Sequence, residues 1–116
     1  MATGKITKDP KPIYFAGTRD SQLTSGACYG YYHPDNNSVS LYVSFVSTNN
    51  ITAASTLFTV PSQYRPSGAA YGVCMMMDAS GGGCSVGDLV LNTSGQISQS
   101  ASNSRRLGIG VMEYPI

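Results

Sequence analysis

The chain has 116 residues, enough for one hydrophobic core and too few for two. Charged residues make up 11% of it, against about 25% in ordinary soluble domains. The net charge of +1 gives no field that attracts nucleic acid, anionic lipid or acidic substrate, which excludes a basic-patch protein. No apolar run approaches the ~20 residues that cross a bilayer, and Lys5 and Lys8 interrupt any apolar leader segment.

Residues 1–12 carry three lysines and two prolines without an apolar pattern. This composition predicts a linker or N-terminal tail. The fold is expected to begin near Ile13, so residues 13–116 form the single predicted domain.

The clearest strand is predicted at residues 38–46, where Val39, Leu41, Val43 and Phe45 alternate with polar residues. A tyrosine-rich strand is predicted at residues 27–33. The sequence Pro-Asp-Asn-Asn between these two segments is typical of a turn, so the pair predicts a β-hairpin.

The remaining segments also favour short strands and many turns. Further strands are predicted at residues 56–60, 71–77, 85–91, 96–98 and 107–114, with a proline-bounded loop at 63–68 and turns at 78–83 and 92–95. No segment has a helical apolar stripe over three turns. Seven or eight short strands predict an all-β fold, an antiparallel β-sandwich of jelly-roll-like type.

Three cysteines, Cys28, Cys74 and Cys84, cannot all pair within one chain. Free thiols buried as small apolar side chains are therefore expected, as in a protein assembled in cytosol. Cys74 and Cys84 flank a predicted turn, which leaves a cross-strand disulfide open as an alternative. The single histidine and the cysteine spacing do not fit zinc, so no metal or cofactor is predicted.

The sequence offers little for catalysis. Asp35, Asp78 and Asp88 stand beside glycine, asparagine or serine, where an aspartate usually bonds its own backbone. No nucleophile elbow is present, and the glycines before Cys84 lack the lysine of a phosphate-binding loop. We therefore expect that the protein is not an enzyme.

Two motifs and the chain end carry a family resemblance. Residues 57–67 read Leu-Phe-Thr-Val-Pro-Ser-Gln-Tyr-Arg-Pro-Ser, residues 90–97 contain Ser-Gly-Gln-Ile, and the last strand ends Tyr-Pro-Ile. This set resembles the C-terminal head domains of bacteriophage tail fibres and baseplate receptor-binding proteins. Val60 replaces the leucine that is more usual in the first motif.

The resemblance implies a homotrimeric β-sandwich at the tip of a viral appendage. Its expected function is host attachment through a saccharide or protein on the bacterial surface, and its expected location is the virion, after assembly in the host cytoplasm. An upstream tail or baseplate protein is the other implied partner. The alternative is a structural virion domain without a ligand, such as a capsid decoration or a fibre-capping knob.

The residues themselves also favour self-association. Tyr42 and Val46 lie opposite Leu41 and Phe45 on one predicted strand, so apolar side chains occupy both of its faces. At least one of the three consecutive methionines at 75–77 must face outward by the same alternation. An obligate homotrimer is the predicted assembly.

Five residues are candidates for ligand contact: Tyr32, His33, Asn36, Tyr64 and Arg65. Tyrosine offers a ring for stacking on a sugar, and arginine offers a planar donor fork. As alternatives, Tyr29 and Tyr31 serve core or inter-subunit packing, and Arg65 fixes its own loop to a neighbouring strand or subunit. The site is expected in turns at the end of the molecule farthest from residues 1–12.

Overall fold

The computed structural model describes residues 11–47, 54–77, 84–99 and 107–116. These residues form nine strands and one 3-10 turn, and every strand pair is antiparallel, which confirms the predicted all-β antiparallel fold. None of their helical segments is long and apolar enough to cross a membrane. The elements are β1 (Ile13–Ala16), β2 (Thr18–Arg19), β3 (Leu23–His33), β4 (Ser38–Ser47), β5 (Phe58–Thr59), η1 (Ser62–Tyr64), β6 (Ala70–Met77), β7 (Cys84–Leu91), β8 (Gln96–Gln99) and β9 (Leu107–Pro115).

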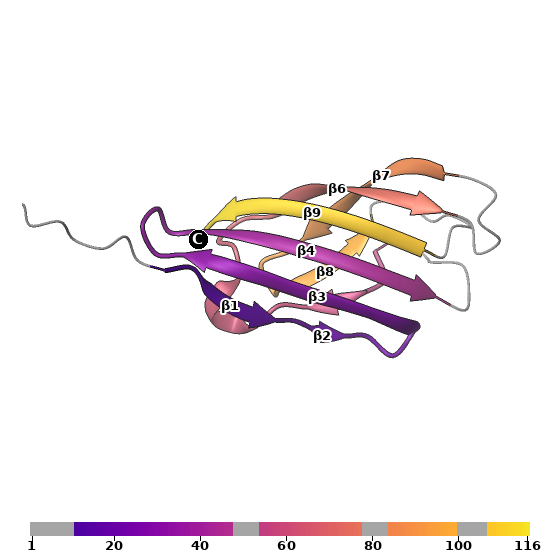
Figure 1. The fold of residues 1–116 in the computed structure, drawn as a ribbon, viewed down its shortest axis with the longest axis horizontal. Coiled ribbons are helices and arrows are strands. Elements are labelled where there is room, and N and C mark those ends of the chain that lie inside the picture. Colours follow the sequence, from indigo (N-terminus) through magenta and orange to yellow (C-terminus); the bar gives the residue numbers. More distant parts are fainter. Residues whose placement is uncertain (1–10, 48–53, 78–83, 100–106) are drawn as a thin grey trace, which may run out of the picture.

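The strands form one sheet in the order β1-β3-β4-β9-β6-β7-β8-β5-β2. Its two outermost strands, β1 and β2, are separated in the chain by Gly17 alone, so the sheet is nearly closed on itself. Figure 1 shows β3, β4 and β9 side by side as long strands, with β6 and β7 beyond β9. Closure in this way protects the sheet edges that an open sheet would expose.

The alternation of side chains along β4 places the core as predicted. Val39, Leu41, Val43 and Phe45 are buried, while Tyr42 points to the outer side of the sheet. Strands β5, β7 and β8, with the residue just before β5, contribute a second set of side chains that are completely enclosed. That set is Leu57, Phe58, Leu89, Leu91 and Ile97.

The predicted hairpin is confirmed, and β3 begins at Leu23, four residues before the predicted start. The polar residues at this end give no apolar alternation, but they pair with β4 across an irregularity between Leu23 and Ser25. The predicted strand at 56–60 is shorter, because only Phe58 and Thr59 belong to β5. The predicted turn at 78–83 lies outside the described residues.

The alternative of a disulfide between Cys74 and Cys84 is wrong. The β6–β7 register pairs Cys74 with Gly87 and Cys84 with Met77, and Cys74 is a free thiol. Cys28 is also free and buried. Burial raises the pKa of Cys28 to about 12 and that of Cys74 to about 11. Both groups are therefore neutral thiols at neutral pH and poor nucleophiles.

Candidate functional site

A polar cleft, called here the hairpin cleft, lies where the turn between β3 and β4 meets the end of β9. The β4–β9 register brings the two segments together by pairing Ser38 with Pro115 and Ser40 with Glu113. The cleft has a volume of about 390 Å³. Its lining residues are His33, Asp35, Asn36, Ser38, Ser40, Glu113, Tyr114 and Pro115.

A chain of hydrogen bonds runs through the hairpin cleft. His33 Nε2 lies 2.9 Å from Ser40 Oγ, and Ser40 Oγ donates to Glu113 Oε2 at 3.1 Å. A carboxylate only accepts, so Ser40 uses its single proton on Glu113 and the His33 nitrogen acts as the donor to Ser40. A serine nucleophile needs a histidine that accepts its proton. In this order of bonds His33 does not accept the proton of Ser40.

The turn of the cleft is fixed to the chain end. Asn37 has the left-handed backbone angle φ of 54°, which asparagine tolerates better than most residues. Its side-chain nitrogen donates to the Ile116 carbonyl at 3.0 Å, and the Ile116 amide donates to the Asn37 carbonyl at 3.0 Å. Asn36 is exposed and accepts from Ser38 Oγ at 2.6 Å. The cleft thus has a preformed polar wall.

The structure separates the five candidate residues into two groups. His33 and Asn36 line the hairpin cleft, whereas Tyr32 points to the opposite side of β3 and is half-buried. The Tyr32 ring lies 5.8 Å from that of Tyr64, which stacks on Phe15 at 4.3 Å. Only the Tyr32 hydroxyl reaches the turn, where it donates to Asn37 Oδ1 at 2.7 Å. Tyr32 and Tyr64 therefore support the wall behind the cleft and do not line it.

Arg65 fixes its own loop to a neighbouring segment of the same chain, as the alternative interpretation expected. Its Nε donates to the Val60 carbonyl at 3.0 Å, which fixes the loop after η1 to the end of β5. Arg65 also packs against Gly95 of the neighbouring turn, because a Cβ there would lie 2.4 Å from its Nε. It does not line the hairpin cleft.

The expected position of the site refers to residues 1–12, of which the structure describes only Lys11 and Pro12. Ile13 pairs with Tyr32, so the turn after β3 lies at the same end of the sheet as the start of β1. Figure 1 shows that turn and the start of β1 near one another. Strand pairing and not chain order decides which turn lies beside β1, so the hairpin cleft lies at the end of the sheet where Lys11 and Pro12 lead into β1.

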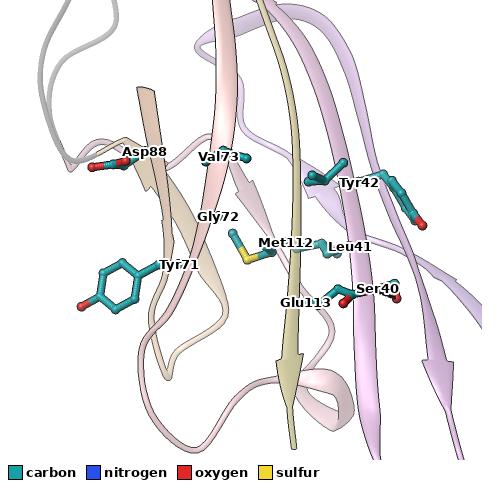
Figure 2. A pocket seen from close by; sticks show the side chains of 10 residues that line it. Ser40, Leu41, Tyr42, Tyr71, Gly72, Val73, Asp88, Met112 and Glu113 are labelled. Carbon is teal, nitrogen blue, oxygen red and sulfur yellow. Dashed lines mark hydrogen bonds between the residues drawn. The ribbon is translucent and has the colours of Figure 1, made fainter. Parts of the chain in front are cut away.

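A second cavity, called here the split groove, opens where β6 and β9 diverge beyond the pair Val73 and Val111. Gly72 of β6 and Met112 of β9 line it, and the groove has a volume of about 680 Å³. Figure 2 shows Tyr71 and Asp88 on one side of it, with Tyr42, Ser40 and Glu113 on the other. The other lining residues are Leu41, Val73 and Val111.

Glu113 connects the cavities of this part of the surface. It lines the hairpin cleft, the split groove and a third cavity of about 450 Å³ between the loop at 66–69 and the end of β9. Ser40 lines the first two. A ligand in the hairpin cleft would thus meet a carboxylate that is held in place by a serine hydroxyl.

The outer side of the sheet next to the cleft is mostly apolar over six strands, with Ser44, Asp88 and Glu113 as exposed polar residues on it. We call this surface the tyrosine face. Its side chains are between 37% and 75% exposed, and cross-strand pairs such as Tyr29 with Tyr42, Tyr42 with Val111 and Val111 with Val73 make it continuous. It consists of Tyr14, Tyr29, Tyr31, Tyr42, Tyr71, Val73, Met75, Val86, Ile109 and Val111.

Sequence reasoning missed Ser40 and Glu113 as members of the site. Ser40 is the diagonal neighbour of His33 in the β3–β4 pair, so its proximity to His33 could have been predicted from the hairpin. Glu113 is 73 residues from Ser40 in the chain, and no local pattern indicates that β9 pairs with β4. The split groove depends on the same distant pairing.

Comparison with protein-family models and with curated proteins finds no match to this chain.

Proposed function

We propose that this chain is an attachment domain of a bacteriophage tail fibre or baseplate, and that it binds a neutral saccharide of the bacterial surface in the hairpin cleft. The observation that carries the proposal is the meeting of His33, Asn36, Ser40 and Glu113 in one preformed polar cleft. The assignment to a phage appendage rests on the resemblance of residues 57–67 and 90–97 to the head domains of such proteins.

The chemistry of the cleft favours a neutral sugar over an anionic one. Asp35 and Glu113 supply carboxylate acceptors for sugar hydroxyls, while the Asn36 side chain supplies both donors and acceptors. None of the described residues that line the cleft is lysine or arginine. An acidic saccharide would therefore meet two carboxylates without a compensating cation, which costs affinity.

A glycan array with the intact chain tests this proposal. The probes are immobilised neutral oligosaccharides and their sialylated counterparts, and we expect binding to the neutral set only. Asn36→Ala and Glu113→Gln each remove a polar group from the cleft and should weaken that binding about tenfold. Gln63→Ala is the matched control, because Gln63 is exposed on η1 and does not line the cleft.

The melting temperature of each variant separates a lost contact from a lost fold. Weaker binding by Asn36→Ala and Glu113→Gln with unchanged melting temperatures supports the proposal. Full binding by both variants places the ligand elsewhere and contradicts it. Absence of binding to every probe, together with failure of the domain to attach to host bacteria, would favour the structural virion domain without a ligand.

A further inference from the structure

The tyrosine face carries an inference that is independent of the proposed ligand. Ten apolar side chains on β1, β3, β4, β6, β7 and β9 point away from the core, and all of them are at least 37% exposed. The tyrosines contact one another: the Tyr29 and Tyr42 rings stack at 5.3 Å, and the Tyr14 and Tyr31 rings meet edge to face at 5.7 Å. We propose that a second copy of this chain covers the tyrosine face.

The area of the face matches what a stable dimer needs. A large side chain contributes about 150–250 Å² when fully exposed. At the observed exposures the ten residues together present on the order of 1,000 Å² of accessible surface. The largest apolar patch on a typical monomer is about 300–600 Å², and a standard interface takes about 800 Å² from each partner. The area of the tyrosine face therefore exceeds that of the largest apolar patch on a typical monomer and reaches the area that one partner contributes to a standard interface.

The opposite outer wall of the sheet differs in composition. Its outward positions on β2, β5 and β8 include Thr18, Thr59, Gln96 and Ser98, all polar and partly or fully exposed. The same chain thus places polar side chains outside one wall and apolar side chains outside the other. Contact with water explains the polar side chains on β2, β5 and β8, but it does not explain the exposed apolar side chains of the tyrosine face.

The charge distribution favours a copy of the same chain as the occupant. None of the six strands that build the face places a lysine or arginine on it among the described residues. The face carries two carboxylates, because exposed Asp88 pairs with Val73 and exposed Glu113 follows Val111 on the same side of β9. A surface without cations has no means to hold an anionic lipid or a strongly acidic protein. An apolar face does complement another apolar face, as cyclic self-association requires.

The split groove gives such a copy a place to anchor. It lies between Tyr42 and Tyr71, and Val73 and Val111 at the middle of the face also line it. Aromatic side chains that enter pockets near the centre of an interface supply most of its binding energy. The hairpin cleft shares Ser40 and Glu113 with the groove and lies at the margin, where interfaces are ordinarily polar.

Light scattering on a size-exclusion column, from low micromolar to high micromolar protein, tests the proposal. The expected mass is a multiple of 12.2 kDa. Val111→Arg places a charge on the central strand β9 and should reduce the mass to that of one chain. Thr59→Arg is the matched control on the opposite wall and should leave the mass unchanged. Met75→Lys is a second disruptive variant on another row of the face.

Circular dichroism melting shows which variants remain folded. A folded Val111→Arg or Met75→Lys monomer beside an associated wild type and control supports the proposal. A wild type that has the mass of one chain at every concentration overturns it. A folded variant that keeps the wild-type mass also overturns it, because association would then use another surface. The measured mass does not depend on saccharide binding. Failure of the glycan array and failure of the self-association test can therefore be told apart.

Discussion

Neighbouring residues on β3 have different environments because the side chains of a strand alternate between its two sides. Tyr31 lies on the tyrosine face with 37% of its surface exposed, whereas Tyr32 packs behind the hairpin cleft against Tyr64. His33 returns to the outer side and bonds Ser40. Adjacent tyrosines in the sequence therefore have two different roles: Tyr31 belongs to an outer surface, and Tyr32 supports the turn between β3 and β4.

Gly72 provides the first test at this scale, since it lines the split groove where β6 comes close to β9. A Cβ at position 72 would lie 2.4 Å from the Val111 carbonyl oxygen and 2.6 Å from Met112 Cβ. Gly72→Ala should therefore force β6 away from β9 and lower the free energy of unfolding by about 1–3 kcal/mol. Urea unfolding followed by circular dichroism measures this loss.

Gly68→Ala is the matched control for that variant. A Cβ at position 68 meets no atom within 4 Å, so the unfolding free energy should stay within about 0.5 kcal/mol of the wild type. Equal stability of Gly72→Ala and the wild type would show that β6 and β9 are not packed this closely.

The buried thiols predict a loss of stability at alkaline pH. In the unfolded chain a thiol ionises near pH 9, whereas in the folded chain the pKa of Cys28 is about 12 and that of Cys74 about 11. The folded state therefore holds protons that the unfolded state has released, and stability falls as pH rises above 9. Between pH 8 and pH 10 the two thiols together should cost about 2–3 kcal/mol of unfolding free energy.

Urea unfolding at a series of pH values gives that slope. Cys74→Ala removes one of the two thiols, so its unfolding free energy should fall by about half as much over the same pH range. The comparison uses the change with pH and not the absolute stability, which the small cavity in the variant also lowers. A variant with the full wild-type slope would mean that Cys74 is not a buried neutral thiol.

At the scale of the elements, the sequence predicts best what depends on near neighbours. The β3–β4 hairpin follows from alternation in residues 38–46 and a turn of four residues, and its register pairs His33 with Ser38 as such a turn requires. The outward position of Met75 and the burial of Met76 follow from the same alternation. Local pattern alone therefore places most strands and decides which side chains enter the core.

Pairing between distant strands is what the sequence does not reveal. The neighbours of β9 are β4 and β6, although β8 precedes it in the chain. Only this arrangement brings Glu113 to Ser40 and opens the groove between β6 and β9. The sequence contained His33 and Asn36 as candidates for the hairpin cleft, but the side of the cleft that β9 supplies was not predictable from local patterns.

At the scale of the whole molecule, the two proposals reinforce each other without depending on each other. One sugar contacts few groups, so a single hairpin cleft should bind weakly. Copies joined through the tyrosine face would present two or more clefts together, which raises the overall affinity for a surface by roughly 10²–10⁴ without any new contact. The trimer expected from the sequence stays a prediction, which the measured mass resolves.

The most direct test of the covered tyrosine face is the oxidation of its methionine. Met75 is 51% exposed in the single chain, while Met76 and Met112 are 2% and 4% exposed. Dilute hydrogen peroxide followed by peptide mass spectrometry gives the rate at which each sulfur becomes a sulfoxide. At a protein concentration where the chains associate, we expect Met75 to react as slowly as Met76 and Met112, and in the Val111→Arg variant several times faster than either. Rapid oxidation of Met75 in the wild type at every concentration would contradict the covered face.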